Sequence, residues 1–318
     1  ISTLLNGSDI NIRTINSYFH NITSFSNPII YNLYNSYLYF ENSKISNISS
    51  INNKLFNEQA ELHFKNTIFE NIESNSINVI EVYSQPLTFD SCTFNNIICY
   101  GDANASSLIK IDSVERKNKY IFNDLSINNC KSNSDLIKIA GNDVQIEISH
   151  TTIKNIFSYG SVINDIALKS FVKIKNSNFT DNTNINKVKC GIVSIYGDSE
   201  LLINNSNIIN NESKTSGGFM CINNVNFLDI NISSSNFENN HGLDGGAFYI
   251  NKGTTMDSIS SIRIYNTLFK NNVAYNFGGA IYSDIEMFNI TDINNVKFIG
   301  NNAYAGGSIY IKNDNANI

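Results

Sequence analysis

A short motif recurs from one end of this chain to the other. It consists of an alternating apolar stretch, then Phe or Ile, then in most copies Asn two residues later. We call the Phe or Ile the anchor, and successive anchors are separated by 24 to 33 residues. The eleven anchors are Phe19, Ile45, Phe69, Phe94, Ile127, Ile153, Phe179, Ile208, Phe237, Phe269 and Phe298. Self-similarity at this period indicates a solenoid, in which each repeat buries its apolar face against its neighbours.

Each repeat also carries two β-strand signals, one before and one after the anchor. Residues 144–148 and 171–175 alternate apolar and polar side chains before an anchor, and residues 136–139 and 192–196 do so after one. Such alternation is typical of half-buried strands. The repeats hold three short strands and three corners, with no room for a helix. We therefore predict an all-β, right-handed parallel β-helix of about eleven coils in a single domain, 1–318. A β-sandwich does not account for the repetition.

The position two residues after the anchor favours a tight corner. Asp181 and Gly300 take this place in two copies. The other nine copies have Asn21, Asn47, Asn71, Asn96, Asn129, Asn155, Asn210, Asn239 and Asn271. Asn, Asp and Gly tolerate left-handed backbone angles. We expect these asparagines to form a structural ladder, with amides bonded from coil to coil along the rod.

Charge and hydropathy exclude two classes of partner. The net charge is −6 with an isoelectric point near 5.2, whereas nucleic-acid binding normally needs a clustered basic surface. No apolar run of about 18 residues is present, so this segment is expected to have no membrane span. The chain begins at Ile1 without a signal-peptide pattern, which suggests a processed or truncated product.

Five cysteines and four histidines show no metal-binding pattern. The cysteines have no C-x-x-C spacing, and the histidines fall in distant repeats. Cys92, Cys99 and Cys130 lie in neighbouring repeats, so a local disulfide among them is one interpretation and burial as small apolar side chains is the other. No metal site and no cofactor is predicted.

Nine N-x-Ser/Thr sequons occur, about as many as the abundance of Asn, Ser and Thr produces by chance. They support glycosylation only if the chain is secreted. Asn21 and Asn47 also occupy the corner position, so they are set aside. The candidate N-glycosylation sites are Asn6, Asn104, Asn178, Asn204, Asn211, Asn231 and Asn289, with Asn104 favoured because it lies in an insertion.

The last third of the chain pairs Gly-Gly segments with Phe-x-x-Asn segments. They are Gly217 to Met220, Phe237 to Asn240, Gly245 to Phe248, Phe269 to Asn272, Gly278 to Ile281, Phe298 to Asn301 and Gly306 to Ile309. This alternation resembles the repeats of polymorphic outer membrane (Pmp-type) proteins, most clearly over 200–318. The resemblance implies a secreted or surface-exposed β-helix used in adhesion or as a structural coat. We expect no C-terminal autotransporter barrel of that family within residues 1–318.

Parallel β-helices also include polysaccharide lyases and hydrolases, which need convergent acids or an acid cluster with a basic residue. No three acids share one register here, and no Arg or Lys is placed with them. His241-Gly242 matches only a fragment of a galacturonase motif. The candidate acids are Asp165 with Asp198, Asp229 with Asp257, and Asp284 with Glu286 and Asp292. We predict no catalytic residue and no enzymatic activity.

Tyr249, Tyr282 and Tyr310 follow successive Gly-Gly segments at matching places and form a candidate exposed aromatic stripe for glycan or protein contacts. Both ends of the sequence read as uncapped coils, which would pair with neighbouring copies or further repeats. We therefore expect an extracellular or cell-surface structural protein that forms a rod, coat or filament by end-to-end stacking. The alternatives are an adhesin stalk that binds glycans or proteins and, third, a carbohydrate-active enzyme.

Overall fold

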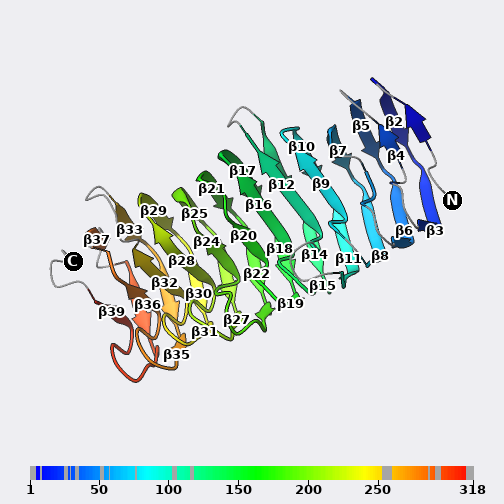
Figure 1. Ribbon diagram of the computed structural model, residues 1–318. Coiled ribbons are helices and arrows are strands. Elements are labelled where there is room, and N and C mark those ends of the chain that lie inside the picture. Colours follow the sequence, from blue (N-terminus) through cyan, green and yellow to red (C-terminus); the bar gives the residue numbers. More distant parts are fainter. Residues whose placement is uncertain are drawn as a thin grey trace.

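The computed structural model describes residues 5–7, 9–24, 28, 30–32, 36–50, 54–56, 58–75, 77–101, 106–114, 118–252, 260–285, 287–290 and 295–312. The described chain is all-β and contains no helix. Its strands stack side by side into an elongated parallel β-solenoid, with the two termini at opposite ends (Figure 1). The predicted fold class is confirmed.

Three long faces run along the rod. The first sheet contains eleven strands, which precede the anchors in the chain. They are β2 (Asn11–Ile15), β5 (Ser36–Glu41), β7 (Ala60–Lys65), β10 (Leu87–Asp90), β13 (Tyr120–Asn123), β17 (Asp143–Ser149), β21 (Lys169–Lys175), β25 (Asp198–Asn204), β29 (Leu228–Ser233), β33 (Ser261–Tyr265) and β37 (Met287–Ile290).

The second face, which we call the anchor sheet, carries all eleven anchors. Four of its coils have one seven-residue strand: β3 (Tyr18–Ser24), β6 (Lys44–Ser50), β8 (Ile68–Ser74) and β11 (Thr93–Cys99). The later coils have shorter strands: β14 (Ser126–Asn128), β15 (Lys131–Ser132), β18 (Thr152–Lys154), β19 (Phe157–Ser158), β22 (Asn178–Thr180), β23 (Thr183–Asn184), β26 (Asn207–Ile209), β27 (Glu212–Ser213), β30 (Asn236–Glu238), β31 (His241–Gly242), β34 (Leu268–Lys270), β35 (Val273–Ala274) and β38 (Lys297–Ile299).

The third sheet follows the anchors and contains nine strands. They are β9 (Ile80–Tyr83), β12 (Ile109–Ser113), β16 (Ile137–Gly141), β20 (Ile163–Asp165), β24 (Val193–Ile195), β28 (Met220–Val225), β32 (Phe248–Lys252), β36 (Ile281–Ser283) and β39 (Ile309–Ile311). In the first coils, β1 (Leu5–Gly7) and β4 (Ile30–Asn32) form a separate two-stranded sheet, joined to the next coil by an isolated bridge from Ile30 to Phe56. About nine turns are therefore complete, slightly fewer than the predicted eleven.

The anchor register predicted from the sequence is confirmed along the whole rod. Each anchor pairs with the next one in parallel, from Phe19 with Ile45 to Phe269 with Phe298. Where consecutive anchors are both Phe, their rings stack, with centroids 4.4 Å apart for Phe69 and Phe94 and 4.9 Å for Phe269 and Phe298. Such offset aromatic contacts add to the free energy gained from burial.

Aliphatic and aromatic side chains from the three sheets fill the interior. In the first sheet, the rings of Phe40, Phe64 and Phe89 stack on successive coils, with centroids 5.2 and 5.3 Å apart. Phe122 on the next coil meets Phe89 edge to face at 5.4 Å. The outward positions of the same strands are polar or half-exposed. Burying the apolar set contributes most of the stability of such a rod, since each methylene removed from water is worth about 0.8 kcal/mol.

Candidate functional site

The outer corner of the anchor sheet has the predicted backbone geometry. All eleven residues two places after the anchors have a positive φ, from 51° to 64°. Nine of these are the predicted corner asparagines, eight of them exposed and Asn239 half-exposed. Their amides bond along the rod in short runs: Asn71 Nδ2 donates to Asn47 Oδ1 at 3.1 Å, and Asn239 Nδ2 donates to Asn210 Oδ1 at 3.1 Å. Where the interval lengthens to 33 residues, Asn129 Nδ2 donates instead to Asn95.

A second asparagine ladder lies inside the same corner, in the last five coils. It consists of Asn182, Asn211, Asn240, Asn272 and Asn301. Asn240 shows the pattern: its Nδ2 donates to Asn272 Oδ1 at 2.9 Å and to the Ile208 carbonyl at 3.0 Å. Its Oδ1 accepts the Asn211 backbone N–H at 3.1 Å and Asn211 Nδ2 at 3.0 Å. The full hydrogen-bonding capacity of the buried amide is used.

The sequence signal for this inner ladder was the Asn of the Phe-x-x-Asn segments, which the sequence analysis used only for the family resemblance. In the earlier coils the same place holds Ile22, Ile48, Ile72, Ile97, Cys130 and Ile156. The corner therefore has an apolar interior in the first six coils and an amide interior in the last five.

The Gly-Gly segments form a second corner, and their two glycines are needed for different reasons. The first of each pair has a positive φ: 69° at Gly217, 63° at Gly245, 65° at Gly278 and 63° at Gly306. The second glycine has no space for a side chain in the inner coils. A Cβ on Gly246 would lie 2.1 Å from the carbonyl oxygen of Gly279 on the next coil. This corner stacks backbone directly on backbone.

The tyrosine stripe lies on the outward face of the third sheet, as predicted, but it is not fully exposed. Rings of Tyr249 and Tyr282 stack with centroids 4.9 Å apart, and those of Tyr282 and Tyr310 at 5.6 Å. Tyr282 is only 7 % exposed, so the prediction of an exposed stripe is wrong at this residue. The rings cover one another because the coils are closely spaced, and burial, with the nearby Tyr249 and Asp284 charges, raises the pKa of Tyr282 to about 12.

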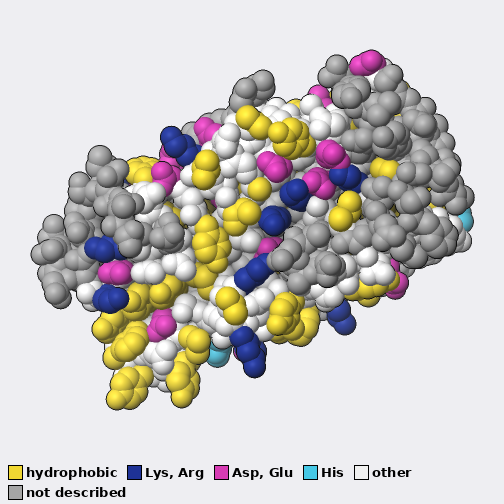
Figure 2. Space-filling model, viewed as in Figure 1, with side chains coloured by type: hydrophobic (Ala, Val, Ile, Leu, Met, Phe, Trp, Pro, Cys, Tyr) yellow, Lys and Arg dark blue, Asp and Glu magenta, His cyan; other side chains and the backbone are white. Residues whose placement is uncertain are grey.

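A different aromatic pair is more exposed. Tyr275 is 77 % and Tyr304 90 % exposed, on neighbouring coils beside one surface hollow, with Asn276 and Asn302 also in its lining. Hydrophobic side chains gather at this C-terminal edge of the rod (Figure 2). No sequence pattern marks Tyr275 and Tyr304, because they lie in a corner without strand alternation.

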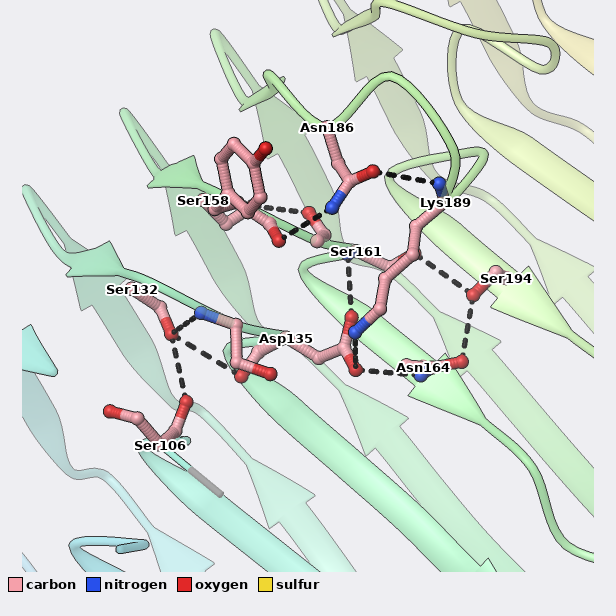
Figure 3. A network of polar contacts seen from close by, with 12 residues as sticks. Ser106, Ser132, Asp135, Ser158, Ser161, Asn164, Asn186, Lys189 and Ser194 are labelled. Atoms are coloured by element: carbon pink, nitrogen blue, oxygen red, sulfur yellow. Dashed lines mark hydrogen bonds and ion pairs between the residues drawn. The ribbon is translucent and has the colours of Figure 1, made fainter. Parts of the chain in front are cut away.

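A buried polar network lies in the middle coils, around the beginnings of the third-sheet strands (Figure 3). Its centre is Asp135, whose side chain is 1 % exposed. Asp135 Oδ1 accepts the Ser161 backbone N–H at 2.9 Å. Oδ2 accepts Asn164 Nδ2 at 2.7 Å and Lys189 Nζ at 3.1 Å. The carboxylate therefore joins three successive coils.

Local sequence explains why the carboxylate fits there. Gly160 lies on the coil beside Asp135, and a Cβ at Gly160 would come within 2.3 Å of Asp135 Oδ1. Lys189 comes from the connection between β23 and β24, where the Asn186 side chain accepts the backbone N–H groups of Val188 and Lys189 at 2.7 and 3.0 Å. Asp135, Gly160 and Lys189 occupy different positions in their repeats, which is why the repeat pattern did not reveal the network.

The disulfide in the structure is not the local one considered for Cys92, Cys99 and Cys130. Cys190 and Cys221, on adjacent coils, form a disulfide with Cα atoms 5.7 Å apart. Cys92, Cys99 and Cys130 are free and buried. Burial raises the pKa of the Cys92 thiol to about 11 and that of Cys130 to about 12. These three side chains therefore act as small apolar groups, the other interpretation given above.

The candidate acids do not converge. Asp165 points into the rod at 1 % exposure, and burial raises its pKa to about 6. Asp198 is the first residue of β25, and its Oδ1 accepts the Phe227 backbone N–H at 3.0 Å. Asp229 bonds to Arg263, with Nη2 to Oδ1 at 2.7 Å, so the expectation that no Arg accompanies these acids is wrong. Asp257, Glu286 and Asp292 lie outside the described residues.

His241 is exposed on β31. In the anchor sheet it pairs with Glu212 on the preceding coil and with Val273 on the following coil. Within the described residues, no group of three or more His, Cys, Asp or Glu side chains is placed to hold a metal ion. The same residues include no helix able to cross a membrane.

The sequons differ in their accessibility. Asn211 is 0 % exposed and belongs to the inner ladder, where both of its Nδ2 hydrogens are donated, so the glycosylation prediction is wrong at this residue. Asn178, Asn204 and Asn231 are half-exposed on strands. Asn104 lies outside the described residues, and for Asn6 and Asn289 only the strand backbone is described.

Comparisons of the chain with protein-family models, with curated proteins and with solved structures find no match.

Proposed function

We propose that this repeat protein is an extracellular structural rod that builds a coat or filament by end-to-end stacking. The fold supplies a uniform material: parallel coils held by backbone hydrogen bonds, paired anchors and asparagine ladders at the corner after the anchors. The observation that carries the extracellular part is the Cys190–Cys221 disulfide, because disulfides between structural elements persist mainly in oxidising compartments.

Stacking is supported by the end coils of the described structure. Ile12, Phe19 and Ile22 at one end, and Phe298, Ile309 and Ile311 at the other, pack against the core yet stay partly exposed. Partly exposed core rows, beside strand edges that have no partner among the described residues, favour the addition of another coil. Contact between unlike ends of identical rods does not close on itself, so it gives an open filament.

Sedimentation velocity and negative-stain electron microscopy of the purified chain test the stacking. We expect fibres whose length increases with protein concentration. An Ile311→Asp variant charges the end row and should abolish them, whereas Tyr265→Asp, on the exposed side of a first-sheet strand, should not. Particles that each contain a single chain at every concentration would contradict the filament.

Peptide mapping of the chain from its natural source tests the location. The proposal expects the Cys190–Cys221 bond and glycan on at least one of Asn178, Asn204 and Asn231. Reduced Cys190 and Cys221, together with unmodified Asn178, Asn204 and Asn231, would contradict an extracellular role.

The second candidate is an adhesin stalk, and the exposed Tyr275 and Tyr304 rings favour it. Aromatic faces with neighbouring amides, here Asn276 and Asn302, suit the apolar faces and hydroxyls of sugars. A glycan-binding assay that compares the chain with Tyr275→Ala and Tyr304→Ala tests this function. Binding lost in both variants, but retained in Tyr282→Phe, is expected; unchanged binding in the alanine variants, or none by the chain itself, would contradict it.

We propose no catalytic role for the Asp135 network in turnover of an external substrate. Its serines are buried, with Ser161 0 % and Ser194 1 % exposed. Degradation of pectin or alginate by the purified chain would contradict that view.

A further inference from the structure

Two side-chain nitrogens converge on one oxygen atom of Asp135. Lys189 Nζ donates to Oδ2 at 3.1 Å, and Asn164 Nδ2 donates to the same oxygen at 2.7 Å. Figure 3 shows the lysine and the asparagine approaching Asp135 from neighbouring coils. A carboxylate bridging an amine and an amide is more than a salt bridge needs, because Lys189 alone would neutralise it.

The orientation of the Asn164 amide follows from its neighbours. An ionised carboxylate only accepts hydrogen bonds, so the Asn164 nitrogen must face Asp135 and the oxygen must face away. That oxygen accepts Ser194 Oγ at 2.9 Å, and Ser161 Oγ donates to Ser194 Oγ at 2.9 Å. The amide is therefore polarised from both sides: a hydroxyl donor on its oxygen and a proton carrier at its nitrogen. A donor on a carbonyl oxygen stabilises the negative charge that develops there during attack on the carbon.

Lys189 and Asn164 share a proton route through Asp135. Lys189 Nζ donates to Asp135 Oδ2 at 3.1 Å, and Asn164 Nδ2 donates to the same oxygen at 2.7 Å. Asp135 is 1 % and Asn164 6 % exposed, so water has little access to this oxygen. Asp135 can take a proton from Lys189 as a base and pass it to a leaving nitrogen as an acid.

We propose that Lys189 and Asn164 form an intramolecular isopeptide bond, with Asp135 as the proton-transfer group. Neutral Lys189 Nζ attacks Asn164 Cγ, and a new Nζ–Cγ bond forms while the Cγ–Nδ2 bond breaks. The departing nitrogen leaves as ammonia, with the proton that Nζ loses carried by Asp135. The reaction exchanges one amide for another, releases one ammonia and needs no oxidant or other reactant.

The placement of this bond gives it a mechanical consequence. It would tie β20 to the connection before β24, next to the Cys190–Cys221 disulfide that ties the same connection to β28. Three successive coils would then be joined covalently through side chains. This inference does not depend on whether the rods stack into filaments.

Mass spectrometry of the full chain, reduced and alkylated, tests the bond directly. We expect an intact mass one ammonia below that of the sequence. A tryptic digest should show no cleavage after Lys189 and a branched peptide joining Lys189 to Asn164. Because this readout uses the unaltered chain, it does not depend on any variant folding.

Variants assign the roles. Lys189→Arg keeps the positive charge, Asn164→Leu removes the amide, and Asp135→Asn keeps the size while removing the proton carrier; each should restore the full sequence mass. Ser213→Ala, on a later coil, should keep the ammonia loss. An unaltered mass in the natural sequence would overturn the proposal. Loss of water located between Asp135 and Lys189 would overturn the role of Asn164 as the acyl donor.

Discussion

The first six coils and the last five solve the same corner in different ways. Both place a residue with positive φ two positions after the anchor. In the first four coils the next residue is Ile and the anchor strand continues for seven residues. In the last five coils it is Asn, and in all but the final one the strand splits into pieces of three and two residues, as from β22 and β23 to β34 and β35.

The difference shows what the inner asparagine provides. Where the strand continues, Ile48 and Ile72 pair directly in the ladder of the anchor sheet. Where the strand splits, the Asn240 backbone N–H donates to Asn272 Oδ1 at 3.0 Å. The amide oxygen thus supplies the acceptor that the strand no longer offers, and an unpaired buried N–H is avoided. The change occurs after Cys130 and Ile156, two coils with a split strand but an apolar inner residue.

The largest effect is expected at the corner formed by the Gly-Gly segments. Only the last coils contain this corner, so a substitution there distinguishes the two regions. Gly246→Ala places a Cβ 2.1 Å from the Gly279 carbonyl oxygen and 2.7 Å from the Val273 nitrogen, both backbone atoms. Since neither can move without parting two coils, we expect a loss of about 4 kcal/mol or more in unfolding free energy. Urea denaturation measures it, with Gly307→Ala as the control, because a Cβ on this second glycine of the last pair would lie 3.7 Å from the Asn301 carbonyl oxygen without a clash. A loss below about 1 kcal/mol would show that the coils do not stack this closely.

The inner asparagine ladder gives the next largest effect. Asn240→Leu leaves the Asn211 N–H groups and the Ile208 carbonyl without their partners, so a loss of about 3 kcal/mol is expected. Ile72→Val, at the matching place in the apolar region, should cost about 1 kcal/mol. The two variants are compared by denaturation under the same conditions. Equal costs would mean that the amides contribute no more than packing.

Asp165, on the sixth and last coil of the apolar region, makes stability depend on pH. Burial raises its pKa from 3.8 to about 6, so the folded chain holds this proton more tightly than the unfolded chain. The unfolding free energy should therefore fall as pH rises from about 4 to about 6 and stay lower above that. Asp165→Asn should remove this fall and stabilise the chain at pH 7 by on the order of 2–3 kcal/mol. Thermal unfolding of both proteins, measured from pH 4 to 8, checks this. An Asp165→Asn variant with the same pH profile as the natural sequence would refute it.

The outer corner should give the smallest effect, and the same one in both regions. Asn239→Ala keeps φ near 54° with a residue that disfavours it, at a cost of about 1 kcal/mol. Asn71→Ala, with φ 51°, should cost the same. Glycine at either position should be nearly neutral, because glycine adopts this angle without strain. A large difference between the two positions in thermal unfolding would show that the ladder bonds, rather than φ, determine the corner.

The fold and the outer corner could be predicted because they depend on residues that repeat. Phe69 and Phe94 recur at an interval that fixes their register, and Asn71 and Asn96 follow them at a fixed distance. The exposure of Tyr282 could not be predicted, since alternation gives the direction of a side chain but not what its neighbours cover. The disulfide and the Asp135 network were missed for another reason. Cys190 and Lys189 lie in a connection of variable length, and Lys189 meets Asp135 across 54 residues.

Amide hydrogen exchange along the whole chain tests most directly the central claim that both regions form one continuous structural rod. The account predicts slow exchange for anchor-strand amides in both regions, such as those of β8 and β34, with protection that extends across the change at Asn182. Rapid exchange throughout one region, at the rate of an unfolded chain while the other stays protected, would contradict it.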